Sequence, residues 1–195
     1  MIKSILLSAA FMLTAFAQKE TTYTANTKTS NVHWLGKKTT GQHEGDVKLK
    51  SGNIAFNGTT PVSGEFVLDM KSVTCTDIKN AEDNQSLVDH LKGKDFFDAE
   101  GSPESVLKIT RFEKGTSANA YNVTANLTIK GTTNAITFPA TVTADKKGAK
   151  ANATITIDRT KWNISYKSKS ILGSMADKFI YDDIQFTVSL YLATK

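Results

Sequence analysis

The sequence contains one cysteine, Cys75, among 195 residues. A single cysteine cannot form an internal disulfide, so the fold must be held by its secondary structure and core. Beyond the first 17 residues, no apolar stretch approaches the length of a membrane-spanning helix. We therefore expect a soluble domain that is stabilised without disulfides and carries no internal membrane span.

The usual catalytic and metal-binding motifs are also missing. The three histidines, His33, His43 and His90, are far apart and none belongs to a His-Glu-x-x-His spacing. The chain has no Gly-x-Ser-x-Gly nucleophile elbow and no phosphate-binding glycine loop. His43 and Glu44 could couple as acid and base, but neighbours on a strand point to opposite faces. The sequence thus predicts no enzymatic activity, no metal site and no cofactor.

A dense block of basic residues is lacking as well. The 24 Lys and Arg residues outnumber the 19 Asp and Glu residues, for a formal net charge of +5, but the lysines are scattered. A nucleic-acid-binding protein concentrates such charge on one element, so we expect no nucleic-acid partner. A mildly basic surface is compatible with peripheral contact with a membrane surface. The oligomeric state is left open, a homodimer included.

The first 17 residues have the layout of a secretory signal peptide. Met1-Ile2-Lys3 is a short basic start, residues 4–16 are uncharged and mostly apolar, and Ala15-Phe16-Ala17 is a small-x-small cleavage site. We predict a signal peptide over 1–17 and one domain over 18–195, exported to the periplasm or secreted. A retained N-terminal anchor is the alternative.

The residues from Tyr121 to Gly131 show the pattern that most of the chain repeats. Apolar and polar residues alternate strictly, and Gly131 marks a turn. Because successive side chains of a strand point to opposite faces, this pattern predicts strands with one apolar and one wet face. The predicted strands cover 23–27, 32–40, 45–50, 54–56, 64–70, 105–113, 121–129, 134–143, 149–158 and 184–192.

One helix is predicted, beginning near Asp83. Asp83 can cap the N-terminus, Leu87, Val88 and Leu91 share one helical face, and Gly93 suits the position after the last turn.

The predicted strands, taken as antiparallel, have exposed edges unless the sheet closes. The periodicity fits a closed barrel, with a two-sheet sandwich as the alternative.

Five segments stand out, in this order: Ser30-Asn31-Val32-His33-Trp34, His43-Glu44-Gly45, 90–98 followed by Pro103, Leu127-Thr128-Ile129-Lys130-Gly131, and 157–162. Together they resemble the YceI-like family of exported bacterial polyisoprenoid-binding proteins. The departures are modest: Gly93 and Asn163 stand where the family commonly has Ser and Gly, and Val88-Asp89 replaces a usual Arg-Asp. Loss of that Arg puts in doubt an ion pair, not the fold.

The resemblance implies an all-β fold: a single antiparallel up-and-down lipocalin-like β-barrel with one short helix packed beside it. It also implies a long apolar tunnel and an isoprenoid lipid or isoprenoid quinone as ligand. The protein would carry this ligand without enzymatic chemistry in the bacterial envelope. The alternatives are an enzyme acting on a lipid in the same cavity and a packed barrel acting as an interaction module.

The apolar faces of the strands supply the candidate tunnel lining. Packing of these side chains against one another is the alternative role. Lys37, Lys38 and His43 are head-group candidates at the tunnel mouth, and Asp158 and Arg159 are expected to form an ion pair at the barrel end. The candidate lining residues are Phe66, Leu68, Tyr121, Val123, Leu127, Ile129, Phe138, Ile155, Ile157, Phe186, Val188 and Leu190.

Overall fold

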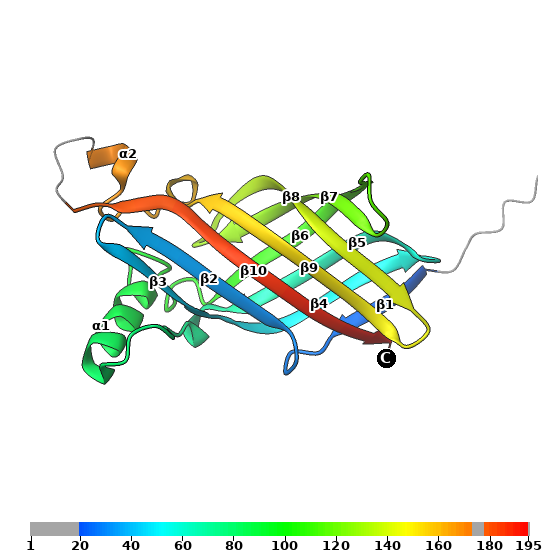
Figure 1. Cartoon of the computed structure of the whole chain (residues 1–195), viewed down its shortest axis with the longest axis horizontal. Coiled ribbons are helices and arrows are strands. Elements are labelled where there is room, and N and C mark those ends of the chain that lie inside the picture. Colours follow the sequence, from blue (N-terminus) through cyan, green and yellow to red (C-terminus); the bar gives the residue numbers. More distant parts are fainter. Residues whose placement is uncertain (1–19, 173–177, 195) are drawn as a thin grey trace, which may run out of the picture.

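Ten antiparallel strands form most of the computed structural model, which describes residues 20–172 and 178–194 (Figure 1). The predicted signal peptide over 1–17 lies outside the described residues. The strands are β1 (Glu20–Ala25), β2 (Asn31–Lys38), β3 (Gly41–Asp46), β4 (Lys48–Asn57), β5 (Thr60–Asp69), β6 (Glu104–Lys114), β7 (Ala120–Ile129), β8 (Thr132–Asp145), β9 (Gly148–Asp158) and β10 (Ile180–Thr194). The helices are α1 (Ala81–Lys92), α2 (Lys169–Leu172) and the short 3₁₀ turns η1 (Met70–Ser72) and η2 (Arg159–Trp162).

The sheet closes into a barrel, as the resemblance implied. Neighbouring strands run in the order β1, β4, β5, β6, β7, β8, β9, β10, and β1 pairs with the last three residues of β10 to complete the ring. In the preceding part of β10, from Ile180 to Ser189, β2 takes the place of β1, and β3 pairs with the other edge of β2. Closure removes strand edges that an open sheet would expose, and one edge of β3 remains outside the ring.

The alternating pattern selects the face that each residue presents. On β7, Tyr121, Val123, Ala125 and Ile129 are buried while the residues between them are exposed or half-buried. The chain then turns sharply through Lys130 (φ 50°) and Gly131 (φ 72°) into β8. Positive φ at both central residues is the conformation that two-residue hairpin turns favour, so the predicted turn at Gly131 is confirmed.

The predicted strand break at 51–53 is wrong, because β4 continues through it. The pairing of β4 with β5 shifts by one residue between Leu49 and Ser51, and Gly52 then lies beneath the ring of Phe66. A Cβ on Gly52 would overlap that ring. The glycine therefore permits close approach of a side chain inside a strand, and it does not mark a turn.

The helix α1 starts earlier than predicted. Its cap is Asn80, whose side chain accepts hydrogen bonds from the backbone N–H groups of Glu82 and Asp83, so Asp83 lies in the first turn. Gly93 follows the last turn, as expected. Figure 1 shows α1 beside one end of the barrel, which we call the α1 end.

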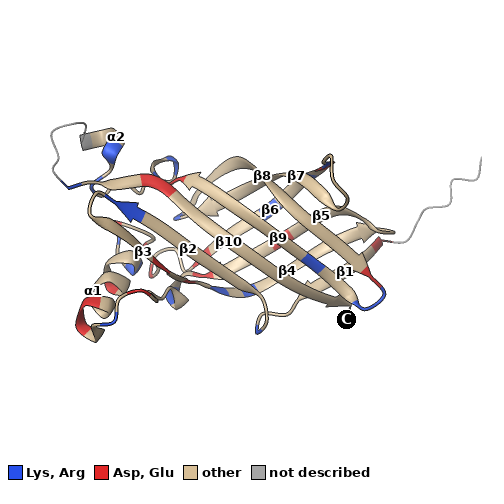
Figure 2. Ribbon diagram, in the orientation of Figure 1, with Lys and Arg blue, Asp and Glu red and all other residues tan. Residues whose placement is uncertain are grey.

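Charges are spread over the surface. In the view of Figure 2, residues of both signs appear on α1, in the loops and near strand ends, without one basic patch. Within the described part of the chain, no helix has the length and apolar character that crossing a membrane requires.

Candidate functional site

The barrel encloses a cavity of about 120 Å³. Its walls extend from Met70 and Phe97 near the α1 end to Phe112 and Val142 in the other half of the barrel. This volume is about ten times what one water molecule needs, but an apolar cavity of this kind stays dry. The interior therefore offers elongated apolar space.

Ten of the twelve predicted lining residues line this cavity. Tyr121 and Ile157 are buried but do not belong to its walls; Tyr121 packs its ring edge-on against Phe112, with centroids 5.8 Å apart. The ten that line it are Phe66, Leu68, Val123, Leu127, Ile129, Phe138, Ile155, Phe186, Val188 and Leu190.

The sequence-based prediction did not include several other residues that line this cavity. Val47 and Leu49 show the alternating signal, so their inward face could have been assigned from it. Trp34 shows the same signal, because it follows Val32 at the alternate position of β2. Phe97 offers none, because it comes from the segment after α1 and enters the barrel only through tertiary packing. Ser105 was also missed, and it is the only buried polar residue of the described chain that lines the cavity.

A second cavity, of about 80 Å³, lies at the α1 end. It shares Trp34 and Phe97 with the first cavity, so the two adjoin. Its walls include all three predicted head-group residues, Lys37, Lys38 and His43. The structure therefore brings these three side chains together beside the apolar interior.

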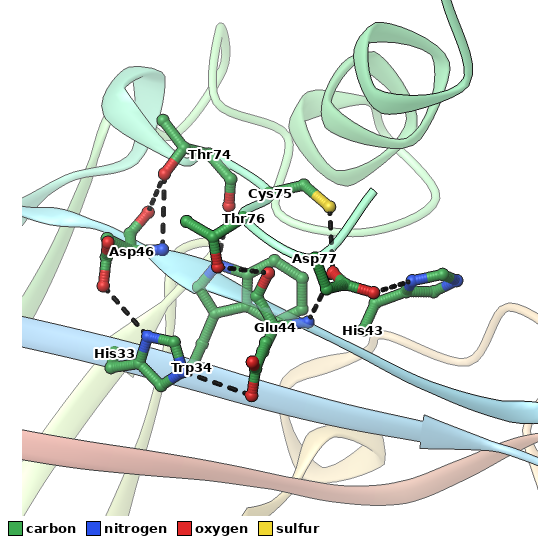
Figure 3. Close-up of polar contacts among 9 residues, drawn as sticks. All are labelled: His33, Trp34, His43, Glu44, Asp46, Thr74, Cys75, Thr76 and Asp77. Carbon is green, nitrogen blue, oxygen red and sulfur yellow. Dashed lines mark hydrogen bonds and ion pairs between the residues drawn. The ribbon is translucent and has the colours of Figure 1, made fainter. Parts of the chain in front are cut away.

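His43 belongs to a polar cluster outside the barrel (Figure 3). Its Nδ1–H donates to Asp77 Oδ2 over 2.9 Å, and its Nε2 accepts from Lys38 Nζ over 2.9 Å, because a lysine ammonium can only donate. The other oxygen of Asp77 accepts from the Glu44 backbone N–H and from Cys75 Sγ–H. Burial opposes ionisation of Asp77, but these hydrogen bonds prevail and lower its pKa to about 2.

The same cluster contains donor types that metals use. The ligand atoms of His43, Cys75 and Asp77 lie within 4.8 Å of one another. Both His43 and Cys75 donate to Asp77, and these hydrogen bonds account for the grouping. Burial raises the pKa of the Cys75 thiol, which favours its protonated, donating form. The cluster fastens residues 73–77 to the edge of β3.

Arg159 does not form the predicted ion pair with Asp158. Asp158 instead caps η2 by accepting from the Thr160 N–H and hydroxyl. The Arg159 guanidinium is fully buried, where it donates to the carbonyl oxygens of Ile164 and Ile180 and lies 3.4 Å from Asp182. Burial lowers its pKa, against the opposing effect of Asp182. Backbone carbonyl groups and Asp182 therefore satisfy the guanidinium in place of the predicted partner.

Solved structures share this architecture. BcnA of Burkholderia cenocepacia superimposes with a TM-score of 0.70 at 24% identity, over 86% of this chain and 98% of that one. A polyisoprenoid-binding domain of Saccharophagus degradans, implicated in plant cell wall breakdown, gives 0.66 at 15% identity, over 89% and 98%. The YceI protein of Campylobacter jejuni gives 0.57 at 18% identity, over 98% and 94%. At these identities the likeness shows a common fold.

The family assignment comes from the sequence as a whole. Comparison with curated proteins gives no match. The model of the YceI-like domain matches residues 23–192, which include all ten strands at least in part and every wall of both cavities. The chain therefore belongs to the YceI-like family.

Proposed function

We propose that this protein binds an isoprenoid lipid or isoprenoid quinone inside the barrel and carries it, without chemical conversion, in the bacterial envelope. The observation that supports this most directly is the elongated apolar cavity, whose walls are the inward faces of the strands. The likeness to a polyisoprenoid-binding domain supports the class of ligand.

The energetics suit a thin apolar chain. Each CH₂ group removed from water contributes about 0.8 kcal/mol, so a prenyl tail offsets the roughly 4–15 kcal/mol that association costs. The tail needs no polar partners, which agrees with walls made of Leu, Ile, Val and Phe. We place the head group at the α1 end, beside Lys37, Lys38 and His43, where the second cavity adjoins the first.

The two alternatives make different demands on the interior. An enzyme acting on a lipid needs several polar groups around the reacting part of its substrate, whereas Ser105 is the only buried polar residue of the described chain that lines the larger cavity. A packed interaction module needs a filled interior, whereas the barrel holds a cavity. Both observations favour the carrier.

Co-purification and thermal unfolding test the proposal. Native mass spectrometry of protein purified from its own host should detect a bound lipid. An isoprenoid quinone at a hundredfold excess over Kd should add about 2.7 kcal/mol, which corresponds to roughly 5–10 °C in Tm for a domain of this size. If no lipid co-purifies and isoprenoid quinones leave Tm unchanged, the proposal is wrong.

A further inference from the structure

One polar side chain interrupts the apolar inner face of β6. Ser105, Leu107 and Ile109 occupy alternate positions of this strand and all three line the larger cavity. Ser105 is 4% exposed. In the described part of the chain, its Oγ is the one buried side-chain nitrogen or oxygen that has no hydrogen-bond partner.

An unpartnered buried hydroxyl costs folding free energy, because it loses its hydrogen bonds to water and gains none. Alanine at this position would leave a slightly larger apolar cavity and bury no hydroxyl. Nothing in the packing of β6 requires the oxygen, since the residue paired with Ser105 across the sheet is Leu68. The hydroxyl is thus available to a molecule inside the cavity.

Ser105 also has a defined position along the barrel. It is the second residue of β6, and the neighbouring end of β5 leads directly into Met70, at the α1 end. This is the end where Trp34 and Phe97 line both the large cavity and the second one, whose walls include Lys37 and Lys38. In the other half of the barrel, the buried wall residues, such as Val123 and Val142, are apolar. Asn152, which also borders the cavity there, is exposed to solvent.

We propose that Ser105 Oγ forms a hydrogen bond with an oxygen atom of the bound lipid. The cavity then selects a prenyl chain that carries an alcohol, ether or carbonyl oxygen over a plain hydrocarbon, and it orients that oxygen toward the α1 end. This inference rests on the proposed function, and it adds the chemical class of the ligand and its direction in the barrel.

Paired ligands of equal carbon skeleton test the selection. We suggest geranylgeraniol, a C20 prenyl alcohol, and the corresponding C20 hydrocarbon, each measured by displacement of a fluorescent lipid probe. The wild type should bind the alcohol about three- to tenfold more tightly, the ratio that a net neutral hydrogen bond provides. Ser105→Ala should bring this ratio close to one, whereas Ser105→Thr, which keeps a hydroxyl, should retain most of it.

Leu107→Ala is the matched control, because it removes apolar wall from the same row of β6 and leaves the hydroxyl in place. This substitution should weaken the binding of both ligands and leave the ratio of their affinities unchanged. Thermal unfolding gives a second measurement: without ligand, Ser105→Ala should unfold at a higher temperature than the wild type, since it removes the unpartnered oxygen. The rise in Tm on adding the prenyl alcohol should be smaller for Ser105→Ala than for the wild type.

The outcomes separate the two proposals. If the wild type binds neither ligand, the proposed function fails. If it binds both equally, or if Ser105→Ala keeps the preference for the alcohol, lipid binding stands and the role of Ser105 is overturned. A preference that Leu107→Ala also abolishes would overturn it too, because the selection would then depend on wall shape.

Discussion

At the scale of single residues, His33 links two strands outside the barrel wall. Its Nδ1 lies 3.0 Å from Asp46 Oδ1 and its Nε2 lies 3.5 Å from Glu44 Oε2, both on β3. The hydrogen bond to Asp46 raises the pKa of His33 above its ordinary 6.5, against the opposing effect of burial. The protonated ring is therefore favoured in the folded protein.

This raised pKa makes part of the stability dependent on pH. Because the pKa of His33 is higher in the folded than in the unfolded chain, its contribution is fully present below pH 6.5 and is lost as the pH rises through the folded value. We expect His33→Gln to lower the free energy of unfolding by up to about 1 kcal/mol at pH 5.5, and by less at pH 8.5. Urea unfolding at the two pH values measures the difference.

His90→Gln serves as the control for this experiment. Its ring lies 3.7 Å from an Asp95 side chain that is 65% exposed, a weaker arrangement than the two close carboxylates around His33. If His33→Gln lowers the free energy of unfolding equally at both pH values, or more at pH 8.5, the protonated state assigned to the His33 ring is wrong.

At the scale of elements, the free edge of β3 is covered by residues 73–77. The backbone N–H groups of Thr74 and Thr76 donate to the carbonyl oxygens of Asp46 and Glu44, each over 2.9 Å. Trp34 adds a hydrogen bond from its indole N–H to the Thr74 carbonyl. Gly45 lies between these contacts, and a Cβ there would overlap the Thr74 carbonyl oxygen.

This close approach predicts a large effect of a single methyl group. Gly45→Ala would push residues 73–77 from β3, break the hydrogen bonds of Thr74 and displace Trp34 from the walls of both cavities. We expect a loss of about 2 kcal/mol or more in the free energy of unfolding, together with weaker lipid binding. Chemical denaturation and Trp fluorescence measure both effects.

Gly36→Ala on β2 is the matched substitution. A Cβ at Gly36 meets only the Trp34 ring, at an ordinary 3.9 Å. Its stability should remain close to that of the wild type. Equal losses for Gly36→Ala and Gly45→Ala would show that the effect comes from glycine in a strand and not from the contact with Thr74.

At the scale of the whole molecule, the barrel keeps space in its core that a more stable protein would fill. Cavities in cores cost about 24 cal/mol per Å³, so a cavity of about 120 Å³ lowers the stability of the ligand-free protein. Binding of a lipid recovers this loss. Stability and binding capacity therefore oppose each other in this fold.

Filling the cavity should separate these two properties. Ala151 is a small residue in the cavity wall on β9, and Ala151→Leu adds three carbons inside. We expect the ligand-free protein to gain about 1–2 kcal/mol, while prenyl ligands no longer raise its Tm. Thermal unfolding with and without ligand measures both quantities.

Thr156→Leu gives the control on the same strand. Thr156 is exposed on the outer face of β9, so the same side chain is added without entering the barrel. Its ligand-induced rise in Tm should equal that of the wild type. If Ala151→Leu still binds prenyl ligands normally, the ligand does not occupy this cavity.

Much of the fold was accessible from local patterns. Alternation identified the inward face of strands such as β7, and Gly131 identified a turn, because side-chain direction and positive φ are properties of a few neighbouring residues. Gly52 misled the same reasoning, since its role is to admit the ring of Phe66 from another strand. The helix cap was misplaced by three residues because Asn80 and Asp83 offer equivalent capping chemistry.

The site depended more on contacts distant in sequence. Periodicity placed Phe66, Val123 and Phe186 inside, but could not distinguish a filled interior from a hollow one, because the remaining space depends on the volumes of side chains that meet across the barrel. Closure by β1 and β10, the entry of Phe97 and the isolation of the Ser105 hydroxyl all arise from that long-range packing. Local sequence was thus sufficient for the strands and their apolar faces, whereas the cavity and its polar end emerged from how those faces meet.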